Sequence, residues 1–263
     1  MKVSYFPGCT LKNKAKDLDM YAYKSAEALG VTLEEIENWQ GCGGVFTTSR
    51  NEVATKLSSV RALKAAAEKE QPLVTVCSAC HNVIKQTNHF MQTDKEFSDK
   101  VNRYMAADGG YFGEAEVYHY LEMLRDLVGF DKVKAAVKNP LTGKKIAAYY
   151  GCLLLRPNSV MKMDDPENPR IMEDFIKALG AEPVVYAKRN ECCGGYVSVE
   201  SPELAKKNSN SVVSNAKSNG AEMIITACPL CKYNLVKNGA DIPVVYFTEL
   251  LAEALGVKEG ANE

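Results

Sequence analysis

Nine cysteines and their spacing are the feature of this sequence most able to do chemistry. They are Cys9, Cys42, Cys77 and Cys80 in the first half, and Cys152, Cys192, Cys193, Cys228 and Cys231 in the second. Each set ends in Cys-x-x-Cys, a spacing that lets two thiols hold one metal ion or two neighbouring ones. Disulfides are scarce in the cytosol, and an odd total does not fit a fully paired disulfide framework. The pattern therefore indicates metal or redox chemistry.

A constant offset relates the two sets of cysteines, which indicates an internal duplication. A shift of 151 places Cys42 on Cys193, Cys77 on Cys228 and Cys80 on Cys231. We therefore expect two homologous domains, residues 1–140 and 141–263, packed with pseudo-twofold symmetry. Near the end of each half the shift falls to 127, because residues 117–122 match 244–249. The first domain should therefore hold an insertion, mostly helical, at about 81–113.

Short apolar runs alternate with amphipathic helical patterns in both halves. The apolar runs predict strands at 2–6, 73–76, 117–120, 145–150, 183–186, 223–226 and 243–247. This rhythm predicts an α/β fold of two homologous Rossmann-like lobes, each with a parallel sheet and right-handed crossovers, related by pseudo-twofold symmetry. Ligands on such sheets bind at the carboxyl ends of the strands. Because several cysteines directly follow predicted strands, each set should gather at one edge of its sheet.

Local signals predict where two helices lie. Asn168 is a suitable N-cap and Pro169 suits the first helical position, so a helix is expected from there to Gly180. In the first half, an apolar stripe over residues 53–67 predicts the helix that follows Cys42.

The five thiols of the second half suit a cluster of several metal ions better than a single ion. Adjacent cysteines project in different directions, and Gly194 and Gly195 let the backbone approach a cluster so that its N–H groups can bond to sulfide. Iron–sulfur clusters commonly take four thiolates. Tetrahedral zinc also takes four ligands, so zinc remains an alternative, chiefly at the four-cysteine first site. Buried structural thiols are a further alternative.

The pattern Cys-x(n)-Cys-Cys-Gly-x(n)-Cys-x-x-Cys, complete in the second half and repeated with one cysteine fewer in the first, resembles the cysteine-rich CCG domains and especially the B-subunit family of heterodisulfide reductase. The resemblance covers essentially the whole chain and includes residues 149–152, 164–169, 192–195 and 247–251. It implies that Cys152, Cys192, Cys193, Cys228 and Cys231 hold a noncubane [4Fe–4S] cluster. The first half departs from the family, because Gly41-Cys42-Gly43 stands where Cys-Cys-Gly is expected. Cys9, Cys42, Cys77 and Cys80 remain for a [4Fe–4S] cluster of ordinary type or for zinc.

The resemblance implies an oxidoreductase subunit that reduces a small disulfide, or oxidises thiols, within a heterodisulfide reductase-like complex. Catalysis would take place at Cys192 and Cys193 through the bound cluster. The sequence has neither a dinucleotide fingerprint nor a ferredoxin-type cysteine run. Electrons should therefore come from partners, which the resemblance gives as a ferredoxin-like iron–sulfur subunit and a flavin-bearing subunit. The alternative is a non-catalytic electron-transfer subunit of a succinate- or glycolate-oxidising dehydrogenase.

Composition argues against several other classes of partner. The net charge is −1 and the pI about 6.4, which gives no electrostatic reason to bind nucleic acid or an anionic membrane. No stretch approaches the roughly 20 apolar residues that a membrane span needs, and the N-terminus lacks a signal-peptide core. We therefore expect a cytoplasmic protein with no direct membrane span.

Five further residues have two interpretations each. His81 follows Cys80 and is expected to face solvent at a helix start rather than to pass protons. His119 is expected to be structural within a strand. Lys188 and Arg189 either attract an acidic thiol substrate or belong to a solvated loop. Trp39 is expected to pack in the core rather than to shield the first site.

Overall fold

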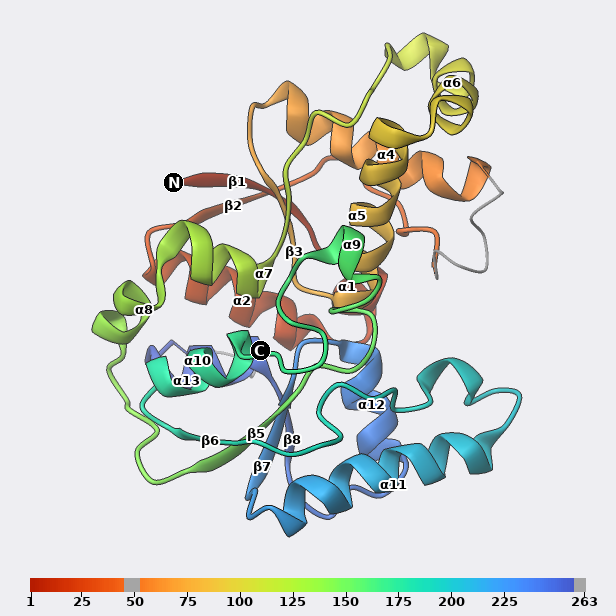
Figure 1. Cartoon of the computed structure of the whole chain (residues 1–263). Coiled ribbons are helices and arrows are strands. Elements are labelled where there is room, and N and C mark those ends of the chain that lie inside the picture. The colour runs from red at the N-terminus through yellow and green to blue at the C-terminus, as the bar shows by residue number, and fades with distance from the viewer. Residues whose placement is uncertain (45–52, 258–263) are drawn as a thin grey trace.

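The structure of this protein is a computed structural model, which describes residues 1–44 and 53–257. The chain forms two α/β lobes, each built on a four-stranded parallel sheet (Figure 1). The first sheet has the order β2-β1-β3-β4, and the second has the order β6-β5-β7-β8. The strands are β1 (Lys2–Phe6), β2 (Thr32–Glu35), β3 (Leu73–Thr75), β4 (Val117–His119), β5 (Lys145–Tyr149), β6 (Glu182–Val184), β7 (Met223–Thr226) and β8 (Val244–Tyr246). The equal order of the two sheets confirms the predicted fold class.

Burial explains why these short segments form parallel strands. In both β1 and β5 the leading lysine is exposed and every later residue is buried, as expected for a strand covered on both faces. In each sheet the first strand pairs on one side with the second and on the other side with the third. The order in which strands are added to the sheet therefore reverses between β1 and β3 and between β5 and β7. Such switch points open a crevice at the carboxyl ends of the strands.

Helices cover the sheets and fill the space between them. In the first lobe they are α1 (Cys9–Asn13), α2 (Lys16–Ala28), α4 (Val53–Glu68), α5 (Ser78–Thr93), α6 (Lys95–Tyr104), α7 (Tyr120–Glu122) and α8 (Phe130–Ala136). In the second lobe they are α9 (Asn158–Met161), α10 (Ile171–Ala178), α11 (Pro202–Ser218), α12 (Pro229–Lys237) and α13 (Phe247–Ala254). The expected insertion is helical, since it consists of most of α5, then α6 and a short 3₁₀ turn, before Gly109.

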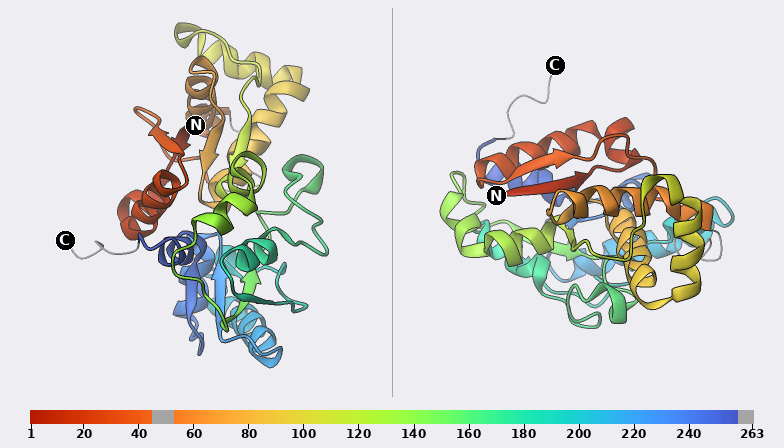
Figure 2. Two further views of the ribbon diagram at one scale, coloured as in Figure 1. Left: turned by 90° about the vertical axis from the view of Figure 1, so that its left-hand side faces the viewer. Right: turned by 90° about the horizontal axis from the view of Figure 1, so that it is seen from above.

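The two lobes share one core. Helix α2 of the first lobe packs against α13 of the second, and both views in Figure 2 show them side by side. The ring of Phe247 contacts Tyr120 of the first lobe as well as Phe175 and Tyr246 of the second. One cluster of buried apolar side chains accordingly draws on both lobes, and a smaller one lies within the second. The domain boundary between residues 140 and 141 stays a prediction.

The start of α10 differs from the prediction. The helix begins at Ile171 rather than at Pro169, and Arg170 is its N-cap residue. The carboxylate of Asp164 accepts hydrogen bonds from the backbone N–H groups of Arg170 and Ile171. These N–H groups have no partner within the helix, so a carboxylate brought in from six residues upstream satisfies them. The side chain of Asn168 instead accepts a hydrogen bond from Arg189.

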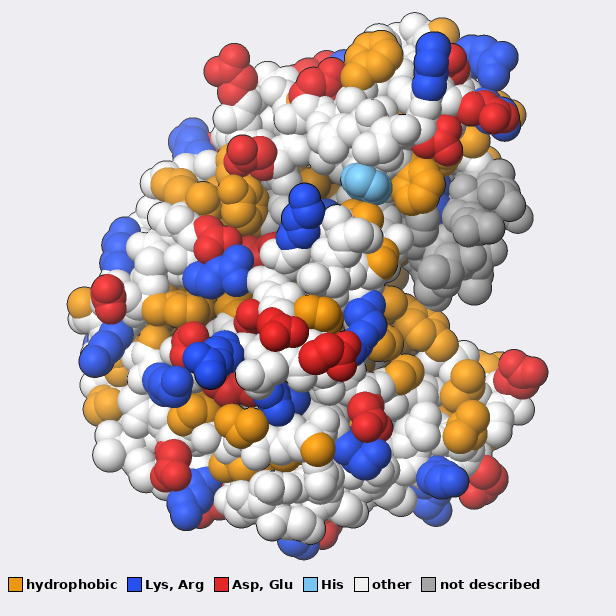
Figure 3. Space-filling view, in the orientation of Figure 1, with side chains coloured by type: hydrophobic (Ala, Val, Ile, Leu, Met, Phe, Trp, Pro, Cys, Tyr) orange, Lys and Arg blue, Asp and Glu red, His pale blue; other side chains and the backbone are white. Residues whose placement is uncertain are grey.

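The surface carries both signs of charge. The space-filling view shows lysine, arginine, aspartate and glutamate side chains interspersed over one face, and a notch between the two lobes (Figure 3). Within the described residues, no helix combines the length and the apolar character that crossing a membrane requires.

Candidate functional site

Six of the cysteines lie at or near the carboxyl ends of the strands beside the two switch points, namely Cys9, Cys77, Cys80, Cys152, Cys228 and Cys231. Cys9 starts α1 directly after β1, and Cys77 is the N-cap of α5 after β3. In the second lobe, Cys152 follows β5 and Cys228 is the N-cap of α12 after β7. Each Cys-x-x-Cys thus spans a strand end and the first turn of a helix, where backbone N–H groups point outward and favour negative charge on sulfur.

Eight of the nine thiols form a series of neighbours that runs through both lobes, and Cys9 is not part of that series. In the first lobe Cys42 contacts Cys80, and Cys80 contacts Cys77. In the second lobe the series runs through Cys228, Cys231, Cys193, Cys192 and Cys152 in that order. None of the nine cysteines forms a disulfide, and Cys9 and Cys192 are exposed at the surface while Cys152 is half-buried. Free thiols packed against one another are typical of a site that holds metal.

The five thiols of the second lobe surround a small cavity. The Sγ atoms of Cys193 and Cys231 lie 3.7 Å apart. The Gly194 N–H donates to the Cys192 Sγ at 3.3 Å, so this glycine brings a backbone donor to a cysteine sulfur. The cavity is lined by all five thiols, and Tyr150, Leu153, Tyr196 and Leu230 are among the residues that complete its wall. An apolar wall with sulfur donors excludes water and favours soft metal ions.

A glycine before the first cysteine of each lobe lets the chain approach the last thiol of the Cys-x-x-Cys in the same lobe. Gly8 has φ +79°, and a Cβ there would lie 2.9 Å from the Cys80 Sγ. Gly151 has φ +65°, and a Cβ there would lie 3.3 Å from the Cys231 Sγ. Both positions therefore need a residue without a side chain, for reasons of conformation and of space. The repetition of this contact shows that the duplication preserved the geometry of the thiols.

Contacts among the thiols shift their acidity in opposite directions. Hydrogen bonds from Cys152 and Cys193, with help from the N–H groups of Gly194 and Gly195, lower the pKa of Cys192 well below that of a free thiol. Contact with Cys192, followed by burial, raises the pKa of Cys152. In the first lobe, the hydrogen bond from Cys80 lowers the pKa of Cys42 to about 7. At least one thiolate is thus favoured in each set, and the thiolate is the form that binds metals.

The two sets of thiols meet at the lobe interface, a relationship that the sequence did not predict. Cys77 and Cys228, which occupy equivalent positions in the two lobes, contact each other. Beside them, the backbone N–H and hydroxyl of Ser78 both donate to the carbonyl oxygen of Ala227, at 3.2 and 2.8 Å. The two edges of the sheets therefore form one continuous site.

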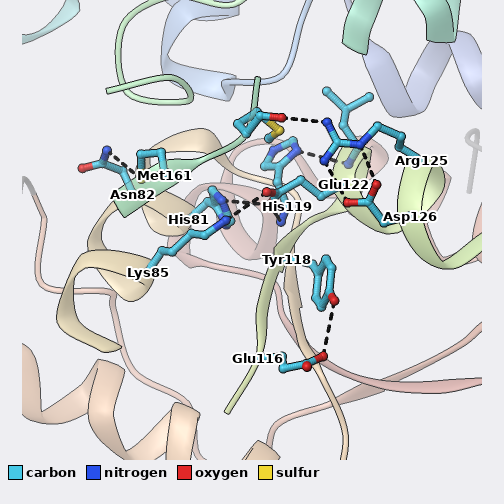
Figure 4. A network of polar contacts seen from close by, with 12 residues as sticks. His81, Asn82, Lys85, Glu116, Tyr118, His119, Glu122, Arg125, Asp126 and Met161 are labelled. Carbon is cyan, nitrogen blue, oxygen red and sulfur yellow. Dashed lines mark hydrogen bonds and ion pairs between the residues drawn. The ribbon is translucent and has the colours of Figure 1, made fainter. Parts of the chain in front are cut away.

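His81 is fully buried, so the prediction of a solvent-facing side chain is wrong. The start of α5 lies between the lobes, where the helix contacts the segment that follows Cys152. The His81 Nε2 lies 3.1 Å from Glu122, and Lys85 lies 2.9 Å from the same carboxylate (Figure 4). Burial opposes ionisation of Glu122, but His81 and then Lys85 hold its pKa far below the ordinary value.

His119 is structural, as predicted. It ends β4 with no exposed surface, and burial lowers its pKa to about 3, so the ring is neutral. Its Nδ1 accepts from the Leu121 N–H, which places the proton on Nε2. The Nε2–H then donates to the carbonyl oxygen of Val76 at 3.0 Å, directly before Cys77.

The remaining candidate residues also have structural contacts. Arg189 is buried, forms an ion pair with Glu173 and donates to the Tyr186 carbonyl, so it is not a solvated loop residue. Lys188 pairs with Glu191 at the surface. Trp39 is partly buried against Phe6, as expected for packing, and its Nε1 donates to Glu35.

The donor set fits a cluster of several metal ions. Within the described residues, no group of three or more histidine, cysteine, aspartate or glutamate side chains is arranged to hold one metal ion. The five sulfurs of the second lobe surround one cavity, an arrangement that suits ligands of a polynuclear cluster, in which each thiolate binds a different iron. At Gly8 and Gly151 the backbone comes close to the sulfurs of Cys80 and Cys231, and the Gly194 N–H donates to that of Cys192.

Comparison with known proteins gives consistent results. The family model of the CCG cysteine-rich domain matches residues 3–85 and again 146–236. The chain is 31% identical to the 8-methylmenaquinol:fumarate reductase membrane anchor subunit of Wolinella succinogenes, over 97% of this chain and 92% of that protein. It is also 31% identical to a protein of Archaeoglobus profundus that is named as similar to the heterodisulfide reductase B subunit, over 97% of this chain and 91% of the relative.

Two further similarities extend these results. The B subunit of a ferredoxin/F(420)H(2)-dependent CoB-CoM heterodisulfide reductase from Methanosarcina acetivorans is 28% identical over 97% of this chain and 89% of its own length. Among solved structures, a hypothetical protein from Helicobacter pylori matches with a TM-score of 0.74 at 12% identity. That match covers 97% of this chain but 49% of the solved chain, and it supports the fold alone.

Proposed function

Because the chain belongs to the family of duplicated CCG cysteine-rich domain proteins that includes the heterodisulfide reductase B subunit, we propose that it is the iron–sulfur subunit of a heterodisulfide reductase-like complex. Its reaction is the reduction of a small disulfide, or the reverse oxidation of two thiols. The names of several relatives support this assignment, since they describe heterodisulfide reductase subunits. Such subunits act in complexes, so this chain also has partner subunits.

The ligands of the two proposed clusters come from the two thiol sets. Cys152, Cys192, Cys193, Cys228 and Cys231 hold a noncubane [4Fe–4S] cluster in the second lobe. Cys9, Cys42, Cys77 and Cys80 hold a [4Fe–4S] cluster in the first lobe, where zinc is the alternative. When bound, such clusters supply one-electron redox steps and iron sites with affinity for sulfur. The observation that carries the proposal is the series of thiol contacts that joins both sets through Cys77 and Cys228.

The chemistry of the reaction assigns different roles to exposed and buried thiols. A disulfide takes up two electrons and two protons and becomes two thiols. Cys192 is exposed and adjoins Cys193, so a substrate sulfur reaches the second site from their side. Cys228 and Cys231 are buried, and Cys228 contacts Cys77 of the first lobe, so these two thiols would hold the cluster on its inner side. The electrons come from a ferredoxin-like subunit and a flavin-bearing subunit, and the reducing conditions of the cytoplasm keep the thiols free.

A second candidate function is electron transfer without disulfide chemistry, within a dehydrogenase or a quinol-linked reductase. Two observations favour it. The fumarate reductase relative is 31% identical over nearly the whole chain. In addition, Gly41 occupies the place of the first cysteine of the CCG motif, so the first lobe has one thiol fewer than the second.

The test is anoxic preparation of the full chain, with measurement of iron, sulfide and zinc and electron paramagnetic resonance of each cluster. The proposal predicts iron at both sites and a new paramagnetic signal when a disulfide is added to reduced protein. Cys192→Ser should abolish that signal, whereas the matched Cys42→Ser should change the first site alone. Clusters that are never oxidised by disulfides would support the second candidate, and zinc without iron would exclude both.

A further inference from the structure

An open cleft lies between the lobes beside Cys9. It encloses about 1090 Å³ and is lined on one side by α1 and the start of α2, and on the other by α12. On α12 the exposed apolar side chains Leu230, Tyr233 and Val236 follow one another at helical spacing. Leu230 also lines the cavity of the second thiol set, so the cleft runs from the first site to the wall of the second.

The pseudo-symmetric counterpart of this cleft is closed. The counterpart lies between α5 and the segment that follows Cys152, because the offset of 151 that relates Cys80 to Cys231 also relates Asn82 to Tyr233. Asn82 is 2% exposed and donates to the carbonyl oxygens of Leu153 and Arg156, both at 2.8 Å. Tyr233 at the equivalent position is 60% exposed. One of two related grooves is therefore filled by the chain itself, and the other is left open.

The open cleft is lined by more basic than acidic side chains. Among the described residues that line it, Lys14, Lys232 and Lys237 are basic and Asp17 is acidic. Lys232 pairs with Glu249 at 2.9 Å, and the Lys237 ammonium lies 5.7 Å from the centre of the Tyr233 ring. No ion pair of Lys14 or Lys237 occurs within the described part of the chain. The cleft thus combines an apolar floor with a basic rim, which is the complement of an acidic surface with an apolar centre.

We propose that this cleft is the docking site of a small acidic iron–sulfur protein that delivers electrons to the first site. This inference rests on the proposed function. A small molecule is a poorer fit, because small-molecule sites bury most of their ligand, whereas Tyr233 and Val236 stand more than half exposed here. Aromatic residues at the centre of a charged rim are typical of protein interfaces. A protein seated on α12 and α1 would cover Cys9, the exposed thiol of the first set.

The experiment measures electron transfer from a reduced two-cluster [4Fe–4S] ferredoxin, used as the probe, to the anoxic, cluster-loaded full chain. One electron leaves the ferredoxin and is taken up by this protein. The double variant Lys14→Glu/Lys237→Glu should lower the second-order rate at least tenfold at low salt, and the wild-type rate should fall as salt is added. The matched control, Lys206→Glu/Lys207→Glu on exposed positions of α11, makes the same change of charge away from the cleft. Tyr233→Ala, with the exposed Tyr104→Ala on α6 as its control, tests the apolar floor.

Iron content and reduction by dithionite should be unchanged in every variant, which separates loss of docking from loss of the clusters. A wild-type rate for the double variant, or an equal loss in the α11 control, would overturn the proposal. A raised KM for a small disulfide with an unchanged ferredoxin rate would overturn it in favour of a substrate cleft. The proposed function fails by a different measurement, namely when dithionite-reduced protein is not oxidised by any disulfide in the absence of ferredoxin.

Discussion

The hydroxyl of Tyr246 in the second lobe lies 2.5 Å from the carbonyl oxygen of Val76 in the first lobe. The same hydroxyl lies 3.1 Å from the carbonyl oxygen of Ala227, so its proton is shared between the residues that precede Cys77 and Cys228. His119 occupies the equivalent position to Tyr246, at the offset of 127, and also donates to Val76. Two related buried side chains therefore fix the backbone where the two thiol sets meet.

Tyr246→Phe should destabilise the chain by about 1 kcal/mol. The change removes one shared hydrogen bond, while Val76 keeps its bond from His119 and Ala227 keeps those from Ser78, so neither carbonyl is left without a donor. Urea unfolding of reduced, metal-free chain measures the effect. Tyr104→Phe, on an exposed side chain, is the control and should change the free energy of unfolding by less than about 0.5 kcal/mol. Equal effects of the two variants would show that the bridge contributes nothing to stability.

Glu122→Gln should destabilise the chain by about 3 kcal/mol, because it leaves the partly buried Lys85 beside an uncharged amide. The glutamine can still accept from the His119 N–H, so the loss isolates the charge of Glu122. Thermal unfolding at neutral pH measures it. Glu96→Gln, which loses the exposed ion pair to Lys100, is the control and should have almost no effect.

The difference in stability between the wild-type chain and Glu122→Gln should depend on pH. The pKa of Glu122 is lowered from 4.5 in the folded chain by His81 and Lys85, against the effect of burial. A lowered carboxyl pKa gives stability that is fully present above the unfolded pKa and is lost as the pH falls toward the folded value. The wild-type advantage over Glu122→Gln should therefore be constant above about pH 5.5 and shrink below pH 4.5. The rings of His81 and His119 also face this carboxylate, and an advantage that grew in acid would assign the dependence to their protonation.

Sequence reasoning found the parts of the site that depend on local pattern. Strands bounded by a lysine and a Gly-Cys, as at Lys2–Phe6, and cysteines placed at strand ends follow from periodicity and from the rules of parallel sheets. What it missed depends on how the lobes dock. The burial of His81, the contact of Cys77 with Cys228 and the closure of one groove by Asn82 arise from residues about 40 to 150 positions apart, and the offset of 151 carries no information on that packing. The one sequence feature that relates to the packing of the lobes is the match of residues 117–122 with 244–249, which aligns His119 with Tyr246.

Gly8→Ala should remove metal from the first site and leave the second intact. The new Cβ would lie 2.9 Å from the Cys80 Sγ, and the positive φ adds strain of at least about 1 kcal/mol. Gly143→Ala is the matched control, because φ there is +81° and a Cβ would meet nothing within 4 Å. Iron analysis with electron paramagnetic resonance should show loss of the first-site signal in Gly8→Ala alone. An equal loss in both variants would assign the effect to backbone strain rather than to the thiol.

Gly41→Cys should give the first lobe the fifth thiol that it lacks. Position 41 is equivalent to Cys192, and a Cβ there meets nothing within 4 Å, so the side chain can be added without displacing a neighbour. If thiol number decides the type of cluster, the first site of this variant should acquire the spectroscopic signature of the second, with no change in iron per chain. Gln40→Cys adds a thiol at the preceding exposed position and should leave both signatures unchanged. Mössbauer spectra of anoxic protein separate the outcomes, and a first site that keeps its original spectrum in Gly41→Cys would show that features beyond the number of thiols distinguish the two lobes.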